Sequence, residues 1–207
     1  MHLGLIVYFK FMKALLIVDL QNDFLPGGSL AVDHGDEVIA VINKLQSRYD
    51  LIVATQDWHP SNHKSFASMH IGHNVFDVIT LHGHNQVLWP NHCVQGTPGA
   101  ALVDTLDMNS IEAIFRKGMD KEIDSYSGFY DNQKLRSTGL HGYLQNKGVD
   151  EVHICGLAAD FCVHFTAMDA LDLGYKTKVV SKATKAIDKD SYMKKKEEFI
   201  HRGGLFI

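Results

Sequence analysis

The stretch that decides the fold is Gly156-Leu157-Ala158-Ala159-Asp160-Phe161-Cys162-Val163. It follows the apolar run 152–155 and precedes an amphipathic segment, so it predicts a strand, a tight turn and a helix with Cys162 in its first turn. Free backbone N–H groups and the helix dipole stabilise a thiolate at such a position and lower the cysteine pKa. Cys162 is therefore a candidate nucleophile, and a small buried structural cysteine is the alternative.

Length and composition indicate one domain that binds a small molecule. The chain has 207 residues, 45% of them hydrophobic, and no Pro/Gly/Ser-rich linker divides it. A net charge of −4 argues against a nucleic-acid surface and against an anionic membrane partner. Three widely spaced cysteines fit a reducing, cytoplasmic compartment better than a disulfide framework.

The first residues, MHLGLIVYFKF, need a separate interpretation. The run is apolar but short, Lys10 interrupts it, and it lacks a small-residue cleavage site. It therefore resembles neither a signal peptide nor a membrane span. We expect residues 1–11 to be an N-terminal extension whose status the sequence leaves open, and residues 12–207 to form a single domain.

Apolar runs that alternate with segments of helical periodicity predict the architecture. Strands are expected at 14–18, 51–55, 111–116, 151–155, 176–181 and 205–207, and helices at 35–48, 135–147, 161–173 and 191–201. This alternation predicts an α/β fold, a doubly wound and mainly parallel six-stranded sheet with helices on both faces. Residues 58–107 lack periodicity, and a loop of this length within a domain is usually functional or disordered. Its aromatic and histidine residues argue against disorder.

Three of the predicted strands deliver Asp19, Lys117 and Cys162 to one edge of the sheet. In doubly wound folds the carboxyl ends of the strands carry the ligand site. A carboxylate there can take the thiol proton and pass it to a leaving amine, while the ammonium group stabilises the thiolate. The alternatives are a capping role for Asp19 and a surface position for Lys117.

Asp57, His59 and His92 form a candidate metal site. Asp57 and His59 are two residues apart at a strand end, which aims both side chains to one side, and His92 reaches them through the long loop. Two imidazoles and a carboxylate suit Zn²⁺, Fe²⁺ or Mn²⁺ and leave coordination positions open. The neighbouring Cys93 is expected to point away, and the alternative is that the histidines are ordinary polar loop residues.

From Met12 to Ile207 the chain resembles the nicotinamidases of the isochorismatase-like cysteine hydrolase superfamily. The matching motifs are VDLQNDF at 18–24, QDWHPSNH at 56–63, WPNHCVQ at 89–95, KG at 117–118 and GLAADFCV at 156–163. The resemblance implies the isochorismatase-like hydrolase fold. It also implies hydrolysis of nicotinamide to nicotinate and ammonia through a cysteine thioester, in NAD salvage, with pyrazinamide as a further substrate to be tested.

Carried over residue by residue, the family's catalytic triad falls on Asp19, Lys117 and Cys162, with Cys162 as the nucleophile. The family's oxyanion hole falls on the backbone N–H groups of Ala158 and Cys162. The resemblance further implies a cis peptide bond between Leu157 and Ala158.

The family's metal ligands fall on Asp57, His59 and His92, whereas His63 is a ligand in some relatives and not in others. One divalent ion is implied, with zinc expected first and iron or manganese as alternatives, and no organic cofactor. No nucleic-acid or membrane partner is implied, and a homo-oligomer is left open. The substrate pocket falls on the aromatic residues Phe24, Trp89 and Tyr126.

Four other functions fit the sequence less well. A sister amidase acting on a carbamoyl or ureido compound would generally lack the metal triad, and an isochorismatase proper lacks the cysteine. A nucleotide-binding module would carry Gly-x-Gly-x-x-Gly after its first strand, where this chain has Asp19-Leu20-Gln21-Asn22. A metal-binding protein without activity would not need Lys117 and Cys162 together.

Overall fold

The structure is a computed structural model that describes residues 12–207, and the N-terminal extension 1–11 lies outside the described residues. A parallel six-stranded sheet in the order β5-β2-β1-β6-β7-β8 forms the centre, as the sequence predicts. Its strands are β1 Met12–Val18, β2 Leu51–Asp57, β5 Ala113–Lys117, β6 Val149–Leu157, β7 Lys176–Lys185 and β8 Leu205–Phe206.

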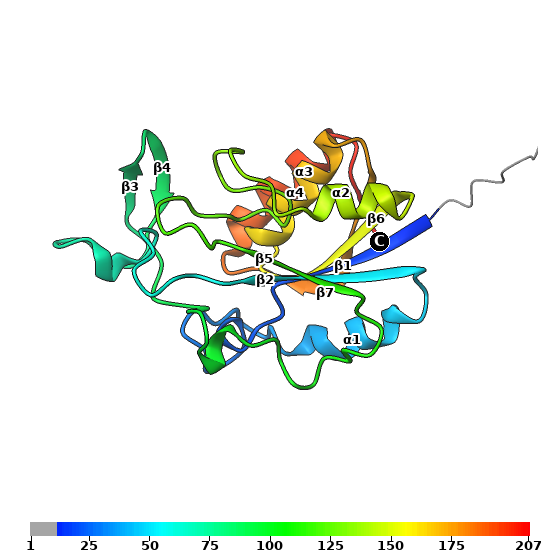
Figure 1. Cartoon of the computed structure of the whole chain (residues 1–207), viewed down its shortest axis with the longest axis horizontal. Coiled ribbons are helices and arrows are strands. Elements are labelled where there is room, and N and C mark those ends of the chain that lie inside the picture. The colour runs from blue at the N-terminus through cyan, green and yellow to red at the C-terminus, as the bar shows by residue number, and fades with distance from the viewer. Residues whose placement is uncertain (1–11) are drawn as a thin grey trace, which may run out of the picture.

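Helices cover both faces of this sheet, which explains why its central strands are mostly buried and rich in apolar residues. In Figure 1, α1 lies below the sheet and the other three helices lie above it. In β1, Leu15 faces the α1 side and Leu16 faces the other side, and both are fully buried. The helices are α1 Glu37–Gln46, α2 Leu140–Asn146, α3 Cys162–Asp172 and α4 Lys189–His201.

Helix α2 begins at Leu140, later than the periodicity predicts. The carboxylate of Asp131 accepts hydrogen bonds from the backbone N–H groups of Gln133, Leu135 and Arg136. These bonds hold the preceding segment in a loop, because a side chain that satisfies backbone donors competes with the helix for them.

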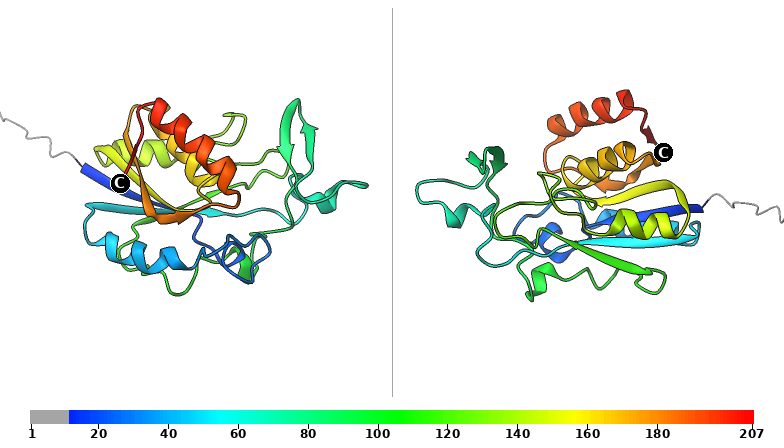
Figure 2. Two further views of the ribbon diagram at one scale, coloured as in Figure 1. Left: turned by 180° about the vertical axis from the view of Figure 1, so that it is seen from behind. Right: turned by 45° about the horizontal axis from the view of Figure 1, so that its top comes forward.

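A two-stranded hairpin, β3 Val78–Leu81 and β4 His84–Val87, interrupts the segment that the sequence predicts as a long loop. His82 and Gly83 form its two-residue turn with φ angles of 51° and 82°, the positive values that such hairpins require. Figures 1 and 2 show the hairpin standing apart from the sheet, beyond the carboxyl ends of the strands. Within residues 12–207, no helix is long and apolar enough to cross a membrane.

Candidate active site

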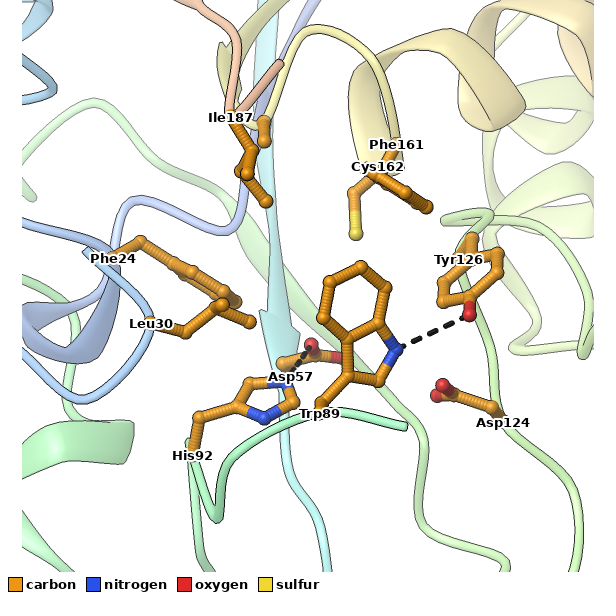
Figure 3. A pocket seen from close by; sticks show the side chains of 11 residues that line it. Phe24, Leu30, Asp57, Trp89, His92, Asp124, Tyr126, Phe161, Cys162 and Ile187 are labelled. Carbon is orange, nitrogen blue, oxygen red and sulfur yellow. Dashed lines mark hydrogen bonds and ion pairs between the residues drawn. The ribbon is translucent and has the colours of Figure 1, made fainter. Parts of the chain in front are cut away.

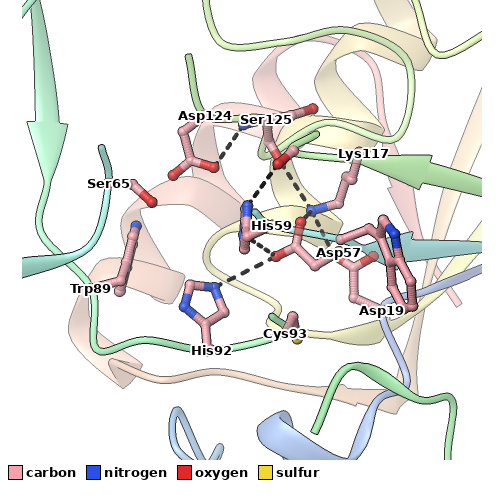
Figure 4. Close-up of polar contacts among 12 residues, drawn as sticks. Asp19, Asp57, His59, Ser65, Trp89, His92, Cys93, Lys117, Asp124 and Ser125 are labelled. Atoms are coloured by element: carbon pink, nitrogen blue, oxygen red, sulfur yellow. Dashed lines mark hydrogen bonds and ion pairs between the residues drawn. The ribbon is translucent and has the colours of Figure 1, made fainter. Parts of the chain in front are cut away.

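Lys117 is the centre of a buried polar cluster at the carboxyl edge of the sheet (Figure 4). Its Nζ donates to Asp57 Oδ1 at 2.6 Å and to the backbone oxygen of Ser125 at 2.9 Å. It also lies 2.8 Å from Asp19 Oδ2 and 3.4 Å from Cys162 Sγ. The structure therefore brings together the three residues that the sequence places at the ends of β1, β5 and β6.

Asp19 follows the last residue of β1 and is held by the neighbouring strand β2. Thr55 Oγ1 donates to Asp19 Oδ1 at 2.6 Å and accepts the Asp19 backbone N–H at 3.2 Å. The backbone of Asp19 has a φ of +48°, a value that costs energy for a residue other than glycine. This conformation directs one carboxylate oxygen to Thr55 and the other to Lys117.

Cys162 is the first residue of α3, directly after the turn that follows β6. Gly156 has a φ of +108°, and a Cβ atom there would lie 2.0 Å from Val18 O, so only glycine fits this close approach to β1. The Leu157–Ala158 peptide bond is cis, as the resemblance implies. Within residues 12–207, the hydrogen bonds of the turn leave the N–H groups of Ala158 and Cys162 unused.

The electrostatics of this cluster differ in one respect from the sequence prediction. Burial raises the pKa of the Cys162 thiol well above its usual value, and the ammonium group of Lys117 only partly offsets this. The predicted lowering of that pKa by the helix start is therefore wrong for the resting site. Burial likewise raises the pKa of Asp19. For Lys117 burial acts in the opposite direction, but the Asp19 and Asp57 carboxylates outweigh it and raise the pKa.

The donors of Asp57, His59 and His92 converge as a metal site requires. The Nε2 atoms of His59 and His92 lie 3.3 and 3.6 Å from Asp57 Oδ2. His59 Nδ1 contacts Gly118 O at 2.9 Å and His92 Nδ1 contacts Pro90 O at 2.8 Å, so each Nδ1 carries the proton and each Nε2 offers a lone pair.

His59 Nε2 is buried without a hydrogen-bond partner among the described residues. An unpaired buried nitrogen is costly, and a cation bound by it removes this cost. Gly118 permits the arrangement, because a Cβ atom at its position would lie 2.4 Å from His59 Cε1. The residues present therefore fit a divalent metal ion.

His63 lies beside this group, its ring 4.4 Å from that of His59, and it forms a second potential ligand set with His59 and Asp124. Burial lowers the pKa of His63 to about 4, so the ring is neutral near pH 7. Ser65 Oγ lies 2.8 Å from His63 Nδ1, and the Ser65 backbone N–H donates to the same nitrogen at 3.2 Å. His63 Nε2, like His59 Nε2, is buried without a hydrogen-bond partner among the described residues, so the geometry keeps His63 as a possible additional ligand.

A small cavity lies between the thiol and the histidines (Figure 3). Its space is about 330 Å³ with the open mouth included, which suits a single-ring ligand better than a dinucleotide. The predicted pocket residues Phe24, Trp89 and Tyr126 all line it, together with Cys162 and His92. The cavity thus joins the nucleophile candidate, the metal-site candidate and an aromatic wall.

Several lining residues have no counterpart among the sequence predictions. They are Leu30, Asp124, Phe161 and Ile187. Asp124 lies two residues before Tyr126, and an acid so near a predicted pocket residue is a signal that the sequence offers. Ile187 carries no sequence signal, because an isolated aliphatic residue after a strand has many possible places in a fold.

Comparisons with known proteins agree with this geometry. Residues 13–207 match the isochorismatase domain family. A nicotinamidase of Acinetobacter baylyi is 53% identical over 175 residues, which cover 84% of this chain and 82% of that protein. Among solved structures, a nicotinamidase/pyrazinamidase of Acinetobacter baumanii has a TM-score of 0.93 at 44% identity, covering 96% of both chains. A pyrazinamidase of Pyrococcus horikoshii in complex with zinc has a TM-score of 0.78 at 36% identity, covering 95% of this chain and 98% of that one.

Proposed function

Because this chain belongs to the isochorismatase domain family, we propose that it is an amidohydrolase that converts nicotinamide to nicotinate and ammonia, in the salvage of NAD. One observation carries the assignment. The Cys162 thiol lines a single-ring cavity, with the ammonium group of Lys117 and the carboxylate of Asp19 behind it. Asp57 and His92 line the same cavity, and their donor atoms converge with those of His59. An amide held by its ring between these groups has its carbonyl carbon near the thiol.

In the first step, Cys162 Sγ attacks the amide carbonyl carbon while its proton passes to Asp19. The raised pKa of Asp19 suits a group that holds this proton temporarily. The carbonyl oxygen becomes an oxyanion, which the backbone N–H groups of Ala158 and Cys162 stabilise. Collapse of this intermediate breaks the C–N bond, Asp19 returns its proton to the nitrogen, and ammonia leaves a thioester on Cys162.

In the second step, a water molecule attacks the thioester and gives up a proton to Asp19. The C–S bond breaks, the sulfur recovers a proton, and nicotinate is released. Lys117 keeps its charge throughout, because the carboxylates beside it raise its pKa. It positions Asp19 and stabilises the developing negative charge on sulfur at 3.4 Å.

Asp57, His59 and His92 would hold one divalent ion, with zinc as the first expectation and iron or manganese as alternatives. When bound, this ion supplies a Lewis-acid position for the ring nitrogen of the substrate. The ring would lie between Phe24 and Trp89, whose faces favour a flat aromatic ligand. Pyrazinamide has the same carboxamide and a nitrogen in the same place, so we include it as a second substrate.

The remaining parts of the proposal, which concern the domain, the compartment and the oligomeric state, rest on the sequence. Residues 12–207 are one catalytic domain, the enzyme works in the reducing cytoplasm, and a homo-oligomer is left open. The sister amidases remain the nearest rivals, and the metal-ligand set disfavours them. No organic cofactor is required, since each proton and bond in the two steps is accounted for.

The direct test is ammonia release by the purified protein from nicotinamide, with benzamide and a carbamoyl compound as controls. We expect nicotinamide to be the best substrate of the three by a wide margin. Equal or faster hydrolysis of the carbamoyl compound would contradict the assignment and favour the sister amidase.

A further inference from the structure

Gln86, on strand β4 of the unpredicted hairpin, does not line the candidate substrate pocket but contacts two residues that do, Asp124 and Tyr126. Its side chain is buried, and its Nε2 lies 2.8 Å from Val87 O, 3.1 Å from Asp124 Oδ2 and 3.1 Å from the hydroxyl oxygen of Tyr126. The carbonyl oxygen of Val87 can only accept hydrogen bonds, so the amide must present its NH₂ group on this side. The orientation of Gln86 is therefore fixed by its partners.

The hydroxyl oxygen of Tyr126 receives a second donor, Trp89 Nε1, at 3.2 Å (Figure 3). An indole N–H and an amide NH₂ cannot accept, so the phenol oxygen is the acceptor in both contacts, and it shares the two N–H groups of Gln86 with Val87 O and Asp124 Oδ2. One donor thus comes from the hairpin and one from the pocket wall. Tyr126, assigned to substrate binding by its resemblance to the family, thus also joins β4 to Trp89.

Trp89 is buried among four other rings. The rings of Phe161, Phe76, Tyr126 and His92 meet it edge to face, with centroid distances of 4.8, 6.0, 6.2 and 6.5 Å. Such contacts restrict the tilt of the ring only loosely, whereas the hydrogen bond at Nε1 sets which edge of the indole faces the cavity.

We infer that Gln86 is a positioning residue that orients Trp89 through the hydroxyl group of Tyr126, which makes the β3–β4 hairpin part of the specificity apparatus. The role in ring recognition rests on the proposed function. The orientation of Trp89 does not rest on the proposed function, because it depends on contacts among Gln86, Tyr126 and Trp89 in the protein without substrate.

The inference predicts a particular kinetic pattern. A wall that stacks on the ring contacts the ground state and the transition state equally, so loosening it raises KM and leaves kcat almost unchanged. For Gln86→Leu we expect KM for nicotinamide to rise about five- to tenfold, the size of one hydrogen bond in a buried site, and kcat to change less than about twofold.

Trp89 fluorescence provides a readout that is independent of catalysis. The chain has two tryptophans, and Trp58→Phe removes the other while keeping an aromatic ring under the guanidinium group of Arg116. In this background Gln86→Leu and Tyr126→Phe should each shift Trp89 emission to shorter wavelength and weaken its quenching by nicotinate. Gln86→Met, which also lacks a donor but keeps an unbranched chain, serves if the leucine variant fails to fold.

The double variant Gln86→Leu/Tyr126→Phe distinguishes two routes by which Gln86 could affect the pocket. Gln86 contacts Tyr126, but it also contacts Asp124, which lies near His59 and His63. If Gln86 acts through Tyr126, then adding Gln86→Leu to Tyr126→Phe changes neither Trp89 emission nor KM any further. Additive effects, a fall in bound metal, or unchanged Trp89 emission in both single variants would overturn the inference. If the parent protein releases no ammonia from nicotinamide, the proposed function fails, while the emission measurement still decides the role of Gln86.

Discussion

Two hydrogen-bonded networks of titratable side chains lie toward the amino ends and the carboxyl ends of the strands of the central sheet, here called its amino edge and its carboxyl edge. The network at the carboxyl edge, around Lys117 and Cys162, borders the cavity described above. At the amino edge, Tyr49 OH lies 2.8 Å from His153 Nδ1, and His153 Nε2 lies 2.5 Å from Glu151 Oε1. Lys178 completes this chain at 2.7 Å from Glu151. In residue types it resembles a catalytic triad as closely as the network around Lys117 does.

The two networks differ in solvent access and in unsatisfied atoms. The side chains of Glu151 and Lys178 are 24% and 27% exposed, and both nitrogens of His153 are paired. At the carboxyl edge the side chains of Lys117 and Asp19 are 0% exposed, and His59 Nε2 has no hydrogen-bond partner among residues 12–207. Suitable residue types are therefore insufficient for a site. Buried, incompletely paired groups beside a cavity are what distinguish it.

Substitution of Cys162 at the carboxyl edge and of His153 at the amino edge should give the largest difference in enzymatic activity. Cys162→Ala should lower nicotinamide turnover by at least about 10⁴-fold, since it removes the attacking atom, while the fold and the metal content stay unchanged. Under the same assay, His153→Ala at the amino edge should stay within about twofold of the parent protein. Substantial activity in Cys162→Ala would refute the nucleophile assignment.

The rates at which the three cysteines are alkylated compare Cys162 with the two other buried thiols, Cys93 and Cys155. Burial raises the pKa of Cys93, Cys155 and Cys162 alike, so all three should react faster as the pH rises and the thiolate fraction grows. We expect Cys162 to be labelled first, because it alone of the three contacts Lys117 among the described hydrogen bonds and lines the cavity. Mass spectrometry that finds Cys93 modified first would count against this.

The two lysines should differ in their contribution to stability. Lys117→Met leaves two buried carboxylates without their cation and should lower the free energy of unfolding by about 3–5 kcal/mol. Lys178→Met breaks a partly exposed pair and should cost less than about 1 kcal/mol. Denaturant titration of both variants tests this, and equal losses would mean that the Lys117 cluster is open to water.

The histidines should differ in their effect on substrate choice. His92→Ala, or removal of the metal by a chelator, should lower kcat/KM for nicotinamide by about 10²-fold, because the ring nitrogen loses its partner. Benzamide has no ring nitrogen, so its slow hydrolysis should change little. If both amides lose the same factor, the metal serves folding or catalysis and not ring recognition.

The smallest effect is expected from removal of residues 1–11. They match no part of the family motifs, and β1 begins at Met12. A protein that starts at Met12 should have the melting temperature and kcat/KM of the full chain. A melting temperature lower by many degrees would show that these residues contribute to the fold or to an interface.

The sequence predicts the sheet and the carboxyl-edge residues because both rest on local signals. Buried strands such as β1 are continuous apolar runs, and residues such as Asp57 stand directly at strand ends. The hairpin was missed although Leu81-His82-Gly83-His84 contains a two-residue turn, because polar residues in β4 hide the alternation.

Other features depend on distant contacts and leave no local pattern. The start of α2 depends on Asp131, and the raised pKa of Cys162 depends on how completely the assembled site excludes water. The contact of Gln86 with Tyr126 joins residues that lie 40 positions apart in the chain. Each of these follows from tertiary packing, which overrides local preference.

The position of Lys117 depends on the register in which β5 pairs with β2. β5 is a five-residue strand at the edge of the sheet, and its last residue, Lys117, pairs with Asp57. A slip of one residue would turn Lys117 to the opposite face and put Arg116 or Gly118 in its place. Insertions are commonly tolerated in surface loops, whereas the proposed role of Lys117 requires the strand register to stay unchanged. We expect an extra residue in the loop before β5 to be tolerated. The same insertion within residues 113–117 should abolish the hydrolysis of nicotinamide.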